Sequence, residues 1–143
     1  MTILFFVHVL TTLMVTGMMW FVQVVHYPLL RYVGQASFSA YETAHTRLAI
    51  ILVVSLMVIE SVTGLMLLVW RPQWLGIELC WVGLALLAII WWSTFCLQVP
   101  QHRILASGFN AQAYQVLVRS NWIRTGSYSA RALLVLWMLA SVM

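Results

Sequence analysis

The stretch from Arg47 to Trp70 reads RLAIILVVSLMVIESVTGLMLLVW, and after Arg47 at its start Glu60 is the one charged residue. A helix can cross the hydrocarbon core of a bilayer when about 20 consecutive residues are predominantly apolar. This stretch is therefore predicted to be a transmembrane helix. Three other segments have the same apolar character: about residues 2–25, about 77–99 and, shorter, about 127–143.

The composition of the whole chain supports a membrane protein. Of its 143 residues, 64% are hydrophobic and 7% are charged, whereas soluble domains carry about 25% charged residues. These values exclude a soluble globule and a disordered chain. The cations are all arginine and the formal net charge is +4. In a membrane protein such an excess reports topology, so we expect no nucleic-acid partner.

The predicted fold is all-α: a single transmembrane domain over residues 1–143, folded as an integral membrane antiparallel four-helix bundle. A tight turn with Pro72 and Gly76 joins the second and third spans. The longest connection lies between the third and fourth spans, and Asn110 there is a residue type that caps helix N-termini. We therefore expect a short helix from Asn110 through Arg119 that lies at the membrane interface.

Arginines are concentrated at one end of the predicted bundle, where residues 26–46 and 101–126 connect the spans. The arginines on or near this end are Arg31, Arg47, Arg103, Arg119, Arg124 and Arg131, whereas Arg71 lies at the opposite end. Because positive residues accumulate on the cytoplasmic side, the arginine-rich end is predicted to be cytoplasmic. Both termini are then predicted to face the periplasm, with the protein in a bacterial inner membrane.

Ionisable residues inside membrane helices are costly, so their positions indicate function or buried pairs. In the first span, His8 and His26 are 18 residues apart, which is about five whole turns at ~100° per residue. Thr12 and Gln23 fall near the same direction. We expect this polar stripe to face the interior of the bundle.

A second polar stripe has the same spacing. Glu42 and Glu60 are also 18 residues apart, and the antiparallel arrangement places Glu60 at the depth of His8, about 10 Å from the periplasmic surface. His8 is the other ionisable residue expected at this depth. We therefore expect an intramembrane polar pair of His8 and Glu60, hydrogen-bonded directly or through one water molecule. Ser61 and Gly64 are small and allow a neighbouring helix to approach.

A cluster of ionisable residues is predicted at the cytoplasmic end. His26 and Glu42 meet there by the same register, His45 follows Glu42 by one turn, and His102 follows the third span. Imidazole and carboxylate groups bind transition metals such as Zn, Fe and Mn. We therefore predict that these four residues bind a cofactor, either a transition metal or haem, or a polar head group. Ordinary interfacial roles for the same residues stay open.

Three functions stay open from the sequence. The first is a metal- or haem-binding site with a redox role at the cytoplasmic face, and the second is a structural or accessory membrane subunit without catalysis. The third is a small permease or proton path that uses His8 and Glu60. No catalytic residue is indicated, because no nucleophile elbow, phosphate loop or Cys-x-x-Cys pair occurs. Besides the lipid bilayer, the expected partners are a second copy of the chain or a larger membrane complex.

Three stretches resemble a pattern found in uncharacterised bacterial four-helix inner-membrane proteins. They are Tyr41–Arg47 (YETAHTR), Gln98–His102 (QVPQH) and Asn121–Thr125 (NWIRT). The resemblance covers most of the chain and implies a bacterial membrane location, but it carries no activity. The chain is also similar in size and topology to small membrane proteins linked to anthrone oxygenation, from which no residue role transfers.

Overall fold

The computed structural model describes residues 3–141, and this part of the chain contains helices and short connections but no strand. The elements in chain order are α1 (Ile3–Phe21), η1 (Val22–His26), α2 (Tyr27–Leu30), α3 (Gln35–Ala49), η2 (Ile50–Val54), α4 (Ser55–Val69), α5 (Ile77–Ser93), η3 (Thr94–Gln98), α6 (Val99–Leu105) and α7 (Ala111–Ala140). The label η marks a π-helical stretch. The predicted all-α class is confirmed.

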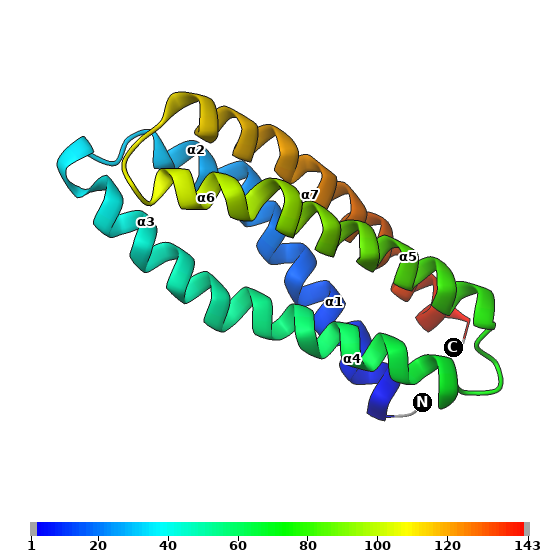
Figure 1. Cartoon of the computed structure of the whole chain (residues 1–143). Helices are drawn as coiled ribbons and strands as arrows, with labels where there is room; N and C mark the ends of the chain where they lie inside the picture. The colour runs from blue at the N-terminus through cyan, green and yellow to red at the C-terminus, as the bar shows by residue number, and fades with distance from the viewer. Residues whose placement is uncertain (1–2, 142–143) are drawn as a thin grey trace.

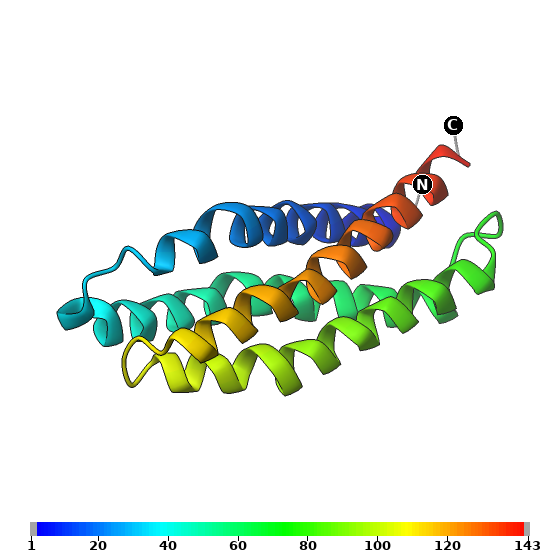
Figure 2. The ribbon, with the colours of Figure 1, turned by 90° about the horizontal axis from the view of Figure 1, so that it is seen from above.

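The π-helical stretches join neighbouring α-helices into longer rods. The three rods formed in this way are Ile3–Leu30, Gln35–Val69 and Ile77–Leu105, and each is long and apolar enough to cross a membrane. We refer to them as the first, second and third segments. The long helix α7 is the fourth rod. Figure 1 shows the three segments and α7 lying side by side, and Figure 2 shows that the start of α1 and the end of α7 lie at the same end of the molecule.

The predicted short interfacial helix is wrong, because α7 is one continuous helix of 30 residues. Asn110 does cap its N-terminus, since the Asn110 side chain accepts a hydrogen bond from the Ala113 backbone N–H at 2.9 Å. The helix then continues past Arg119, because Asn121 and Thr125 are buried and hydrogen-bonded inside the molecule. The predicted outer ends of the first and fourth spans, residues 2 and 143, lie outside the described residues.

Two of the three π-helical stretches have a local cause in the sequence. A proline lacks the backbone N–H and its ring clashes with the carbonyl four residues earlier, which an α-helix cannot accommodate without a kink or a wider turn. Pro28 and Pro100 affect the carbonyls of Val24 and Cys96, which lie inside η1 and η3. No proline follows η2 within the second segment, and nothing in the structure explains its wider turn.

Large apolar side chains are exposed and many polar side chains are buried, which is unusual for a soluble protein. Large apolar side chains cover the outside; Leu133 and Trp137, for example, are each 70% exposed. The buried polar residues are His8, Thr11, Thr12, Gln23, Glu42, Glu60, Thr63, Ser93, Thr94, Gln98, Asn121, Arg124, Thr125 and Arg131. Polar residues of membrane helices face the interior of a bundle, so this distribution is the one expected in lipid.

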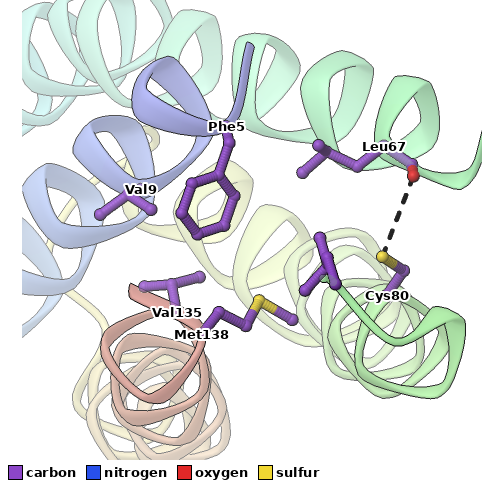
Figure 3. Close-up of a cluster of buried hydrophobic side chains, with 7 residues drawn as sticks. Phe5, Val9, Leu67, Cys80, Val135 and Met138 are labelled. Atoms are coloured by element: carbon purple, nitrogen blue, oxygen red, sulfur yellow. Dashed lines mark hydrogen bonds between the residues drawn. The ribbon is translucent and has the colours of Figure 1, made fainter. Parts of the chain in front are cut away.

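Three apolar clusters alternate with these polar groups along the molecule. Figure 3 shows the cluster near the chain ends, where side chains from α1, α4, α5 and α7 meet, including Phe5, Leu67 and Val135. The Cys80 thiol in this cluster points to the Leu67 carbonyl at 4.0 Å. A middle cluster contains Val15, Met19, Met57, Ile90 and Tyr128, and a third cluster, at the arginine-rich end, contains Tyr27, Leu30, Phe38, Leu105, Ala113 and Leu117. The two polar centres described below lie in the two gaps between these clusters.

Candidate functional site

The first polar centre is a buried ion pair between Glu60 of α4 and Arg131 of α7. Arg131 donates to Glu60 Oε1 from Nε at 2.9 Å, and its Nη2 lies 2.8 Å from the same oxygen. The Thr12 hydroxyl of α1 donates to this oxygen at 2.7 Å, and Arg131 Nη1 donates to the Gly83 carbonyl of α5. One residue from each of the four rods therefore meets at this centre, which ties them together.

No direct hydrogen bond joins the side chains of His8 and Glu60 among the described residues, and the predicted bridge through one water molecule stays a prediction. The Thr63 hydroxyl donates to the Ile59 carbonyl at 2.9 Å and so accepts from His8 Nδ1–H, also at 2.9 Å. The partner of Glu60 is Arg131, which the sequence interpretation placed near the arginine-rich end. Because α7 begins at Ala111, Arg131 lies about 30 Å from the start of that helix. It therefore lies far from the arginine-rich end and reaches Glu60.

The predicted interior position of the first polar stripe is confirmed for three of its members. His8, Thr12 and Gln23 are all buried. The predicted close approach at Gly64 is also present, because a Cβ atom there would lie 3.2 Å from His8 Cε1. His8 and the α4 helix therefore pack at one level, although no hydrogen bond joins the side chains of His8 and Glu60 in the described residues.

The second polar centre, the histidine cluster, brings together the four residues predicted to share a site: His26, Glu42, His45 and His102. His102 Nδ1 lies 2.5 Å from Glu42 Oε1, and Glu42 is fully buried. The Tyr27 hydroxyl lies 3.2 Å from Nε2, the other ring nitrogen of His102. The ring centres of His26 and His45 are 4.2 Å apart in a stacked arrangement, and those of His45 and His102 are 5.7 Å apart.

This cluster does not have the geometry of a shared metal centre. Nδ1 of His102 is hydrogen-bonded to Glu42, and Nε2 of the same ring lies within hydrogen-bond distance of the Tyr27 hydroxyl. Both nitrogens of His102 are then engaged. The rings of His26 and His45 are stacked, so their in-plane lone pairs run roughly parallel rather than converge. Within residues 3–141, no three His, Cys, Asp or Glu side chains are arranged to hold one metal ion.

A cavity of about 370 Å³ adjoins the histidine cluster. Met19, Val53 and Met57 are among its apolar wall residues. Its polar lining residues are Tyr27, His45, Thr46, Thr94, Gln98, His102, Arg103 and Arg124. The lining thus combines apolar and polar side chains, as binding sites for small molecules do.

A second and larger groove, of about 730 Å³, lies on the other side of His45. It runs between the first and second segments, and Met14, Leu48 and Leu52 line it together with His26 and His45. His45 lines both the groove and the cavity, as do Val22, Ala49 and Val53.

Arg124 is the functional candidate that the sequence interpretation missed. It was counted among the interfacial arginines, but its side chain is 7% exposed and lines the cavity. Its Nε is buried without a hydrogen-bond partner. The signal was present in the spacing of Asn121, Arg124, Tyr128 and Arg131, which recur every three or four residues and so share one face of a helix.

Side-chain amides hold the rods together beside the cavity. Asn121 donates to Gln23 Oε1 at 2.9 Å, and Gln23 donates to the Val118 carbonyl at 3.2 Å, which ties the first segment to α7. Gln98 donates to the Ser120 hydroxyl at 3.0 Å and ties the third segment to the same helix. Each of the three stretches that carry the family resemblance supplies residues to the lining of the cavity: His45 and Thr46 from the first, Gln98 and His102 from the second, and Arg124 from the third.

No protein-family model, no curated protein and no solved structure matches this chain. The chemistry of the site is therefore inferred from its own geometry.

Proposed function

We propose that the chain is an antiparallel four-helix bundle that spans a bacterial inner membrane with both termini in the periplasm. The apolar outer surface and the three long apolar segments support a membrane location. With Arg124 and Arg131 buried inside, the remaining arginines still favour one cytoplasmic end. Those at that end are Arg31, Arg47, Arg103 and Arg119, against Arg71 at the other.

A topology reporter tests this orientation. Alkaline phosphatase fused after Met143 should be active, because this enzyme requires the oxidising periplasm to form its disulfides. A reporter inserted in the connection at residues 106–110 should give the opposite signal. An inactive fusion at the C-terminus with an active one at residues 106–110 would reverse the proposed orientation.

We propose that the protein binds an amphipathic small molecule, which enters from the bilayer and places its polar head group beside the histidine cluster. The observation that carries this proposal is the cavity of about 370 Å³, which has apolar walls on one side and Tyr27, His45, His102 and Arg124 on the other. Its volume lies within the range of about 300–1,000 Å³ that is usual for ligand pockets.

Filling the cavity tests this function. Ala49 lines both the cavity and the groove, so Ala49→Trp should occupy the space of the ligand. Purified wild-type protein should release a stoichiometric small molecule on solvent extraction, detected by mass spectrometry, and Ala49→Trp should release much less. Val58→Trp is the matched control, because Val58 is 47% exposed on the same segment and lines neither space. Equal release from both variants would contradict the proposed function.

Haem is a second candidate, and His45 is the observation that favours it. Its side chain makes no hydrogen bond within the described part of the chain and lines both spaces, so a ring nitrogen is available as an axial ligand. Haem would supply the redox chemistry predicted from the sequence. The purified protein should then show a Soret absorption band that His45→Ala removes, and a spectrum without that band would exclude this candidate.

The two other functions predicted from the sequence receive less support from the geometry. A proton path through His8 and Glu60 needs a carboxylate that can exchange its proton, whereas Glu60 is bonded to Arg131 and Thr12. An accessory subunit without a ligand does not require a cavity that has a polar end.

A further inference from the structure

Arg124 is a buried cation that has no ion-pair partner among residues 3–141. The sequence contains three acidic residues, all glutamate. Glu42 is bonded to His102, and Glu60 is bonded to Arg131. Glu78 is exposed in the first turn of α5, at the opposite end of the molecule. None of these three carboxylates forms an ion pair with Arg124.

An isolated guanidinium is expensive to bury. Removing a charge from water costs several kcal/mol unless a partner of opposite charge or a full set of hydrogen bonds compensates it. Arg124 forms no ion pair and no hydrogen bond to any residue between 3 and 141, and its Nε is shielded without a partner. A group from outside the chain can supply the partner that Arg124 lacks among these residues.

The surroundings of Arg124 indicate where that group lies. Arg124 and Arg103 both line the cavity, while the nearby carboxylate, Glu42, is already bonded to His102. The lining of the cavity therefore contains two arginines and no carboxylate. Arginine presents a planar fork of N–H donors that matches carboxylate and phosphate groups in a bidentate way.

We propose that Arg124 binds the anionic head group, a carboxylate or phosphate, of an apolar-tailed molecule whose tail lies along Met19, Val53 and Met57. This inference rests on the proposed function and narrows it, because it names the charge of the ligand. Arg103 is exposed and lies at the rim, where it attracts the anion without being desolvated. The head group neutralises the buried guanidinium, and the tail fills the apolar part of the cavity.

A pair of probes that differ only in head group tests the proposal. The fluorescent fatty acid cis-parinaric acid and the corresponding alcohol are titrated into detergent-solubilised protein. The wild type should bind the acid at least tenfold more tightly than the alcohol. Arg124→Gln should bind both with the affinity that the wild type has for the alcohol. Arg119→Gln is the matched control, since Arg119 is an exposed arginine on the same helix, and it should keep the wild-type preference.

The possible results separate this inference from the proposed function. An acid preference that survives in Arg124→Gln would overturn the assignment of Arg124, while binding of both probes would still support the cavity. Failure of wild-type protein to bind either probe would overturn both. Excess inorganic phosphate should not displace the acid probe. Displacement would show a site for free anions and would overturn the requirement for an apolar tail.

Discussion

Arg124 and Arg131 lie about two turns apart on one face of α7, yet their surroundings differ. Arg131 donates to Glu60 and to the Gly83 carbonyl, and the cavity beside it is about 20 Å³, room for about one water molecule. Arg124 has no ion-pair partner within residues 3–141 and adjoins a cavity of about 370 Å³. The same residue type on the same helix face is thus paired within the chain in one place and, among the described residues, left without an ion-pair partner in the other.

The largest expected effect is at the saturated centre. Glu60→Ala leaves Arg131 buried without its partner, so the free energy of unfolding should fall by about 3–5 kcal/mol. Reversible unfolding of the purified protein in mixed detergent micelles measures this change. Glu78→Ala is the matched control, because Glu78 is exposed, and it should change stability little.

A double variant separates the loss of a pair from the exposure of a charge. Glu60→Met combined with Arg131→Met removes both charges and replaces them with apolar groups. It should be more stable than Glu60→Ala, since a well-packed apolar pair often equals a buried ion pair. If Glu60→Ala were as stable as the wild type, the ion pair would have no structural role and the contrast with Arg124 would disappear.

A smaller loss is expected in the histidine cluster. His102→Ala removes the hydrogen-bond partner of Glu42, whose other carboxylate oxygen already has none, and should lower the free energy of unfolding by about 1–3 kcal/mol. The same unfolding measurement applies. Gln101→Ala serves as the neighbouring control, with little expected change. A loss as large as that of Glu60→Ala would mean that the two centres contribute equally to stability.

Gly64→Ala should have a still smaller effect. The added Cβ would lie 3.2 Å from His8 Cε1 and 3.4 Å from Leu84 Cδ2, so the side chains must shift slightly at a cost of about 1 kcal/mol. Gly17→Ala is the contrasting variant, because no atom lies within 4 Å of its added Cβ. It should raise stability slightly, as alanine does in place of a helical glycine. Equal effects of the two variants would contradict close packing at His8.

Arg124→Met should cost no stability in ligand-free protein. The substitution removes a buried charge that has no partner in the described chain, so the free energy of unfolding should stay the same or rise. The measurement is the unfolding assay after delipidation of the sample. A loss comparable with that of Glu60→Ala would show that Arg124 is stabilised by the chain itself, and its role would then match that of Arg131.

The sequence was sufficient for the fold class but not for the length of α7. Long apolar runs predicted three segments that the structure shows to be long helical rods. The fourth was misjudged because Asn121, Arg124 and Thr125 look like residues of a polar connection. Their side chains instead point inward and bond to other rods or line the cavity, a context that the local sequence does not reveal.

The site was predicted only in part. The prediction assumed an uninterrupted helical register, and the π-helical stretches interrupt it. The step from His8 to His26 was counted at a constant angle per residue, but η1 has a wider turn and changes the phase. His26 therefore stacks on His45 rather than continuing the face of His8. Glu42 and Glu60 are separated by η2 in the same way, yet both are buried, since each meets a partner of its own. Those partners, His102 and Arg131, come from distant parts of the sequence.

The three π-helical stretches also have a mechanical consequence. Each of them contributes to the wall of the cavity: Val22 from η1, Val53 from η2 and Gln98 from η3. Helices bend most readily at such turns and near prolines, whereas α7 passes the same level as an unbroken rod. Bending of the other three rods is thus concentrated around the cavity. The arginine-rich half can tilt about α7 and change the width of the cavity while the contacts around Glu60 and Arg131 stay in place.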